Sequence, residues 1–400
     1  MNDLLTSPKN PLFSRAMVSV LTAQFLSALA DNALLFAAIA MLRLHNAPSW
    51  QIPMLQEFFV IAFILLAPFT GPFADAYPKG RVMLISNAMK FLGAAAMLLG
   101  LHPLLAYNLV GIGAAAYSPA KYGILGELVS ADKLVKANGM MEGSTIVAIL
   151  LGAVVGGKLA ENSVTMALAA ICVCYLLATV ANTLIPRLPV AHKLEYFSPF
   201  VLIRDFWAAL NTLFRNRDAR FSLLGTSVFW GAGSTLRLLL VAWVPVALGI
   251  ADLSMPANMS GGVAIGIALG AAGAASFVNL DKINRTLPAG ILVGVLIMVF
   301  AHATNLYATI ALLLMIGACG GFYVVPLNAL LQERGHASVG TGHAVAVQNF
   351  FENSAMLSLV GLYVLMERTG IPVIQSGTIF GFVVLTAICA LAAFRLSKKK

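Results

Sequence analysis

The stretch AMVSVLTAQFLSALADNALLFAAIAML, residues 16–42, decides how the whole chain is interpreted. It is long enough to cross a bilayer, because a hydrocarbon core of about 30 Å needs roughly 20 residues of helix. Asp31 and Asn32 nevertheless lie near its middle. A charge at that depth costs about 2.5–3.5 kcal/mol on insertion scales, so it is rarely kept without a partner or a polar cavity. The stretch therefore predicts a membrane helix that carries part of a functional site.

The rest of the chain has the same membrane character. Of its 400 residues, 60% are hydrophobic and only 10% are charged, whereas soluble domains average about 25% charged residues. This composition predicts an all-α membrane protein with twelve spans. The spans cover approximately residues 16–43, 53–75, 81–100, 103–129, 134–160, 163–186, 219–247, 255–279, 286–305, 307–333, 341–366 and 373–396.

The basic residues predict the orientation of these spans. Lys9 and Arg15 precede the first span, and Arg395 with residues 398–400 follows the last. The opposite side of the membrane would carry only Arg43, Lys158 and Arg368. Because Lys and Arg accumulate in cytoplasmic loops, we expect a multi-pass membrane protein with both termini in the cytoplasm. The net charge of +9 follows from this topology, and we expect no nucleic-acid partner.

The two halves of the chain resemble each other. AYSPAKYGILGELV (116–129) and FYVVPLNALLQERG (322–335) share the spacing of Tyr, Pro and Glu. NGMMEGS in span five matches QNFFENS in span eleven, which places Glu142 opposite Glu352. Two six-helix halves in the same orientation are the architecture of the major facilitator fold, and here they form two pseudo-symmetric bundles. The predicted parts are a first bundle at 1–186, a cytoplasmic linker at 187–218 and a second bundle at 219–400.

The linker contains a segment with apolar residues at three- and four-residue spacing, FSPFVLIRDFWAALNTLFRNRDAR. This pattern predicts an amphipathic helix along the cytoplasmic surface of the membrane.

The repeat also suggests a partner for Asp31. Arg237 lies in the seventh span, 17 residues after Arg220, and Asp31 lies 16 residues after Arg15. At 1.5 Å per residue, both are about 24–25 Å from their basic flank. We therefore expect an Asp31–Arg237 pair between the two halves. Two interpretations stay open: a permanent structural ion pair, or a pair that substrate or a conformational change must open.

Other polar residues within the spans complete the candidate site. The candidates for substrate binding are Asp31, Arg237, Asn32, Gln24, Tyr117 and Lys121. The candidates for gating or ion coupling are Glu142, Glu352, Gln348 and Asn138. Lys90, in the third span, either points into the interior or extends its side chain toward the cytoplasmic face.

The loop GPFADAYPKGRV, residues 71–82, contains a recognisable pattern. Gly71, Asp75, Lys79 and Arg81 resemble the signature motif of the major facilitator superfamily. The resemblance implies that the Asp caps a neighbouring helix. It also implies that the basic residues latch the cytoplasmic side of the outward-facing state.

Motifs for catalysis and for cofactors are missing from the sequence. There is no GxxxxGK[ST] nucleotide loop, no HExxH pattern and no CxxC pair among the four cysteines. We therefore expect no catalytic residue, no metal and no cofactor.

Four segments together resemble a specific family: ALADNALLFAAIAML, GPFADAYPKGRVM, AAAYSPAKYGILGELV and ANGMMEGSTIVAILLG. They are similar to the lysophospholipid transporters of Gram-negative inner membranes. The resemblance implies a flippase, working among membrane lipids, that moves lysophosphatidylethanolamine and related lysolipids from the outer to the inner leaflet. A separate acyl-ACP synthetase/acyltransferase on the cytoplasmic side would then re-acylate them. The alternative is a proton-coupled exporter of amphipathic drugs on the same fold.

Overall fold

The computed structural model describes residues 12–48, 51–186, 188, 198–250 and 255–397. Within these ranges the chain forms thirteen α-helices and two short 3₁₀ segments. The helices of the first half are α1 (Arg15–Leu44), α2 (Gln51–Ala76), α3 (Lys79–Leu98), α4 (Pro103–Leu128), α5 (Leu134–Asn162) and α6 (Val164–Thr183). After α7 (Pro199–Arg215), the second half contains α8 (Arg217–Leu248), α9 (Met255–Phe277), α10 (Leu287–Ala301), α11 (Leu306–His336), α12 (Thr341–Arg368) and α13 (Val373–Leu396).

The twelve long helices other than α7 correspond to the twelve predicted spans. An all-helical chain suits a bilayer because every backbone N–H and C=O is satisfied within its own segment. Ten of the described helices are long and apolar enough to cross a membrane. The other two, α4 and α12, carry polar side chains such as Lys121, Gln348 and Glu352. We attribute their lower hydropathy to this polar face, which lies at the junction between the two halves.

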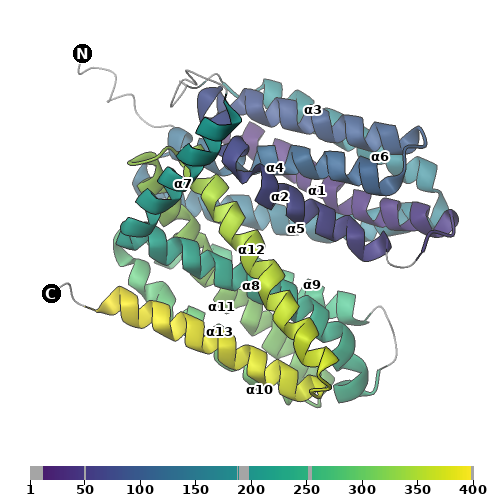
Figure 1. The fold of residues 1–400 in the computed structure, drawn as a ribbon, viewed down its shortest axis with the longest axis vertical. Helices are drawn as coiled ribbons and strands as arrows, with labels where there is room; N and C mark the ends of the chain where they lie inside the picture. The colour runs from purple at the N-terminus through teal and green to yellow at the C-terminus, as the bar shows by residue number, and fades with distance from the viewer. Residues whose placement is uncertain (1–11, 49–50, 187, 189–197, 251–254, 398–400) are drawn as a thin grey trace.

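The helices form two bundles, α1–α6 and α8–α13, which are side by side in Figure 1. Both ends of the described chain lie at the same end of the molecule, which we call the terminal end. The bundles diverge toward the opposite end (Figure 1).

Helix α7 lies at the terminal end and joins the bundles (Figure 1). It buries Leu202, Phe206, Ala209 and Leu213 along one side. The ring of Phe206 packs against Phe350 of α12, with 5.6 Å between ring centroids. Its other side exposes large side chains, including Phe200 and Trp207. This distribution matches the amphipathic helix that we expected within the linker.

Glycines allow close approach of helices within each bundle. A Cβ added at Gly152 of α5 would lie 2.5 Å from the carbonyl oxygen of Leu29 in α1. A Cβ added at Gly266 of α9 would lie 2.2 Å from the carbonyl oxygen of Leu314 in α11. Both contacts are too short for any residue larger than glycine, so glycine at these two positions allows the helices to pack closely.

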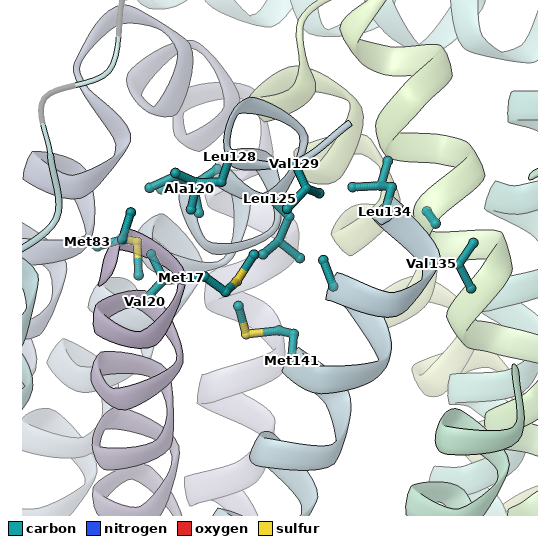
Figure 2. Packing of buried hydrophobic residues seen from close by; sticks show 14 of the residues in the cluster. Met17, Val20, Met83, Ala120, Leu125, Leu128, Val129, Leu134, Val135 and Met141 are labelled. Atoms are coloured by element: carbon teal, nitrogen blue, oxygen red, sulfur yellow. The ribbon is translucent and has the colours of Figure 1, made fainter. Parts of the chain in front are cut away.

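An apolar cluster near the terminal end spans the two bundles. It contains residues of α1, α4 and α5 together with Val324 and Ala329 of α11. Figure 2 shows part of this cluster, with Met17 of α1, Leu125 of α4 and Met141 of α5 turned toward one another. The bundles are therefore packed together at this end.

Candidate functional site

Asp31 lies in a buried polar group inside the first bundle. One carboxylate oxygen accepts a hydrogen bond from Lys90 Nζ of α3 at 2.7 Å. The other accepts from the hydroxyl of Tyr175 in α6, also at 2.7 Å. Lys90 Nζ also donates to Ser27 Oγ at 3.0 Å, and Ser27 donates to Asn87 Oδ1 at 2.7 Å. The charge of Asp31, which is energetically unfavourable inside a membrane, is therefore compensated by partners from its own bundle.

The expected Asp31–Arg237 pair is not formed in this structure. Both oxygens of Asp31 are occupied by Lys90 and Tyr175, and no described carboxylate forms an ion pair with Arg237. Arg237 lies in the second bundle, where it is exposed to a separate cavity. Matching depth on two pseudo-symmetric helices was not sufficient to identify the partner of Asp31, because Lys90 of α3 binds it from within the same bundle.

Three adjoining cavities run from one bundle to the other. The first, which we call the N-terminal cavity, has a volume of about 270 Å³. It is lined by Gln24, Asp31, Asn32, Lys90, Tyr117 and Lys121. The second, the junction cavity, measures about 290 Å³ and shares Lys121 and Phe59 with the first. The third, the C-terminal cavity, measures about 320 Å³ and shares Trp230 and Met356 with the second.

The three cavities differ in polarity. The C-terminal cavity is largely apolar, with Leu240, Val263 and Ile297 in its wall and Arg237 as its one charged lining residue in the described chain. The N-terminal cavity instead carries three charges, on Asp31, Lys90 and Lys121. The row of cavities therefore has one charged end and one largely apolar end.

Four of the predicted substrate residues meet in the N-terminal cavity beside Asp31. Gln24 donates to Thr145 Oγ1 at 2.8 Å, and Asn32 donates to the carbonyl oxygen of Ala28. Tyr117 is buried, and its ring faces Lys90 Nζ at 4.8 Å. Lys121 is also buried, with its Nζ 4.1 Å from the ring centroid of Tyr122.

The two predicted gating carboxylates lie in the junction cavity. Glu142 accepts from the hydroxyl of Tyr122 at 2.5 Å and from Asn328 Nδ2 at 3.4 Å. Glu352 accepts from Gln348 Nε2 at 2.8 Å. Both carboxylates are therefore held by neutral donors.

Asn138 belongs to a contact between the bundles and not to the cavities. It exchanges two hydrogen bonds with Gln332 of α11, at 2.9 and 2.7 Å. Deeper in the membrane, Asn349 of α12 donates to Ser118 Oγ of α4 at 3.0 Å. All four side chains are buried. An amide buried without a partner costs about 1–3 kcal/mol, so these pairs resist separation of the bundles at the terminal end.

The signature loop makes another polar contact between the bundles. The Asp75 carboxylate accepts from the backbone N–H of Gly342 at 2.8 Å and of His343 at 3.0 Å, at the start of α12. Lys79 Nζ lies 3.5 Å from Asp75 and 2.5 Å from Glu127. A carboxylate at a helix N-terminus satisfies unpaired donors and opposes the helix dipole.

The other two predicted motif residues differ in their surroundings. Gly71 lies against α12, where an added Cβ would be 2.9 Å from the Cα of His343. Arg81 is exposed and makes no ion pair with any residue that the structure describes. Of the four motif residues, Gly71 and Asp75 therefore contact α12, and Lys79 pairs with Asp75.

Comparison with known proteins identifies the family. The sequence profile of the Major Facilitator Superfamily matches residues 20–357. The chain is 55% identical over 380 residues to the lysophospholipid transporter LplT of Shigella boydii serotype 4 (strain Sb227), covering 95% of this chain and 96% of that one. LplT of Escherichia coli O7:K1 (strain IAI39 / ExPEC) matches with the same identity and coverage. The chain belongs to the LplT family of the Major Facilitator Superfamily.

Solved structures of other superfamily members have the same fold. The Escherichia coli fucose:proton symporter FucP aligns with a TM-score of 0.74 at 13% identity, over 96% of this chain and 98% of that one. A bacterial homologue of the iron transporter ferroportin, in an outward-facing state, aligns with a TM-score of 0.74 at 16% identity, over 96% and 99%. At these identities the likeness concerns the fold alone. The predicted fold class and the resemblance to lysophospholipid transporters are both confirmed, and this LplT-family member is a multi-pass membrane transporter, not an enzyme.

Sequence reasoning missed several residues of the site in this LplT-family chain. Tyr175, which binds Asp31, lies in the apolar helix α6. The useful signal was that a buried tyrosine hydroxyl usually has a hydrogen-bond partner. Asn328 and Gln332 were missed although they are four residues apart and share one face of α11. His343, whose Nδ1 lies 2.8 Å from Asp75, had no signal in the sequence.

Proposed function

We propose that this chain is a flippase for lysophospholipids such as lysophosphatidylethanolamine. The observation that carries the proposal is the path of three adjoining cavities, which share lining residues and lead from a charged N-terminal cavity to a largely apolar C-terminal cavity. A lysolipid has the same division, with a charged phosphate head group and a single acyl chain. The high identity to relatives named as lysophospholipid transporters supports the same substrate class.

The head group is bound on the charged side of this path. Lys121 and Asp31 line one cavity, so a single zwitterionic head group reaches both, with its phosphate on Lys121 and its ammonium on the exposed edge of Asp31. The acyl chain lies in the C-terminal cavity. Arg237 lines that cavity and has no described carboxylate partner. Its planar guanidinium group carries several N–H donors, which bind the phosphate as the head group passes through the junction cavity.

The direction of transport follows from topology and from the closed end. Lys and Arg accumulate in the loops of the terminal end, which we place in the cytoplasm of a bacterial inner membrane. Contacts between the bundles close this end, at Asp75 with α12 and at Asn138 with Gln332. The structure is then the outward-facing state, which receives lysolipids from the outer leaflet and releases them to the inner one.

Release of the head group requires the contacts at the closed end to break. Glu142 and Glu352 line the junction cavity, which adjoins the head-group cavity, so we assign them to the gate. The product is re-acylated by a separate acyl-ACP synthetase/acyltransferase on the cytoplasmic side.

Uptake of labelled lysophosphatidylethanolamine into right-side-out membrane vesicles tests this function. Wild-type vesicles are expected to accumulate the lipid well above vesicles without the protein. Arg237→Ala is expected to lower uptake about tenfold or more, because a charge-assisted contact to phosphate contributes about 1.5–3 kcal/mol. Arg204→Ala is the matched control, since Arg204 lies exposed on α7, where it contacts Asp205.

Two results would contradict the proposed function. One is equal uptake by wild-type and empty vesicles. The other is proton-driven extrusion of amphipathic drugs without any lysolipid uptake, which would favour the exporter alternative on the same fold.

A further inference from the structure

Lys90 is the one charged residue of the N-terminal cavity to which the proposed transport path assigns no contact. Its side chain is 2% exposed, whereas that of Asp31 is 20% exposed. The ammonium group is therefore enclosed, and the Asp31 carboxylate keeps an open edge toward the cavity. Lys90 therefore compensates Asp31 from a buried position, while Asp31 keeps exposed surface for a head group.

The backbone around Lys90 holds this placement. A Cβ added at Gly113 of α4 would lie 2.9 Å from Lys90 Cγ and 2.9 Å from the carbonyl oxygen of Ser86. The lysine stem therefore passes against α4 at Gly113, where the helix has no side chain. With Ser27 and Asp31 as acceptors and the Tyr117 ring at 4.8 Å, the ammonium is fixed inside the bundle. Of the two interpretations left open by the sequence, the interior one is correct.

The consequence concerns the charge of the cavity. Asp31 contributes one negative charge, and Lys90 and Lys121 contribute one positive charge each. The cavity thus has a net formal charge of +1, and Lys121 is left to attract a phosphate. Without Lys90 the net charge is zero, and an uncompensated Asp31 faces the head group. A bare carboxylate attracts an ammonium and repels a head group that carries only a phosphate.

We propose that Lys90 determines head-group specificity by cancelling the charge of Asp31. Because of this cancellation, the cavity accepts lysolipids that lack an ammonium, such as lysophosphatidylglycerol, alongside zwitterionic lysophosphatidylethanolamine. Lys90 acts through Asp31 and is a positioning residue. The inference rests on the proposed function, because it concerns the substrates of the same cavity.

The test compares uptake of the two lipids by vesicles that carry each variant. Lys90→Met is expected to lower lysophosphatidylglycerol uptake about tenfold and to leave lysophosphatidylethanolamine uptake within about twofold of wild type. The double variant Asp31→Asn with Lys90→Met has the wild-type net charge. It is expected to recover lysophosphatidylglycerol uptake, while lysophosphatidylethanolamine, which has lost its ammonium acceptor, stays low.

Further variants separate specificity from folding. Lys90→Arg keeps the charge and is expected to transport both lipids. If Lys90→Met fails to fold, Asp31→Asn provides the test. It leaves Lys90 uncompensated, so the ratio of uptake is expected to change in the opposite direction, in favour of lysophosphatidylglycerol. An equal loss of both lipids in every folded variant, or an unchanged ratio, would overturn the inference. Failure of the proposed function would give a different result from failure of this inference, since wild-type vesicles would then take up neither lipid.

Discussion

Asp31→Ala is expected to reduce lysophosphatidylethanolamine uptake by about tenfold to a hundredfold and to destabilise the protein. The uptake is lost because the variant removes the acceptor for the ammonium of the substrate. Stability is lost because Lys90 Nζ keeps only Ser27 Oγ as a hydrogen-bond acceptor. Removing one partner of a buried ion pair costs about 3–5 kcal/mol. Uptake assays and the apparent melting temperature in detergent measure the two effects.

A second substitution separates the two effects of Asp31→Ala. Adding Lys90→Met removes the uncompensated cation, so the melting temperature is expected to recover while lysophosphatidylethanolamine uptake stays low. Glu57→Ala is a suitable control, because Glu57 lies outside the three cavities. Wild-type uptake in Asp31→Ala would contradict the assignment of Asp31 to the head group.

Gly270→Ala is expected to prevent stable folding of the second bundle. The added Cβ would lie 2.0 Å from the carbonyl oxygen of Ala318 and 2.8 Å from the backbone nitrogen of Phe322. Both contacts are with the backbone of α11, which cannot move aside as a flexible side chain would. The helices must separate, at a cost of about 3 kcal/mol or more. The yield of monodisperse protein after detergent extraction measures the loss.

The same helix provides the control for this prediction. A Cβ added at Gly262 would meet no described atom within 4 Å, so Gly262→Ala is expected to give wild-type yield. Equal yields of Gly270→Ala and Gly262→Ala would show that the α9–α11 contact is looser than the structure indicates.

The fold could be predicted from the sequence because few local rules determine it. Bilayer thickness sets the length of each span, and the internal repeat sets the number and orientation of the bundles. Helix ends were predicted less accurately. Helix α8 begins at Arg217, two residues before the predicted span, because Asn216 caps it by accepting from the N–H of Asp218 and of Ala219.

The candidate site was predicted in part. Depth in the membrane can be estimated by counting residues, and this placed Asp31 and Arg237 near the middle of their helices. Rotation about each helix axis and the distance between bundles cannot be estimated in this way. The sequence therefore paired Asp31 with Arg237, although Lys90 from the same bundle is the partner in the structure.

The contacts between the bundles were the least predictable part. Asn138 was recognised as an intramembrane polar residue, but its partner Gln332 lies 194 positions away. The sequences of α5 and α11, taken separately, do not indicate that the amides of Asn138 and Gln332 face each other. The same holds for Asp75 and the start of α12, where a family resemblance and not the sequence itself indicated the contact.

Photo-crosslinking tests the central claim, that one lysolipid spans the charged and apolar cavities, most directly. The probe is lysophosphatidylethanolamine with a diazirine near the end of its acyl chain, bound to the purified protein and mapped by peptide mass spectrometry. We predict labelling of residues in the wall of the C-terminal cavity, around Leu240, Val263 and Ile297, that excess unlabelled lipid abolishes. Labelling confined to lipid-facing positions such as Val241 and Phe382, and insensitive to competition, would contradict the account.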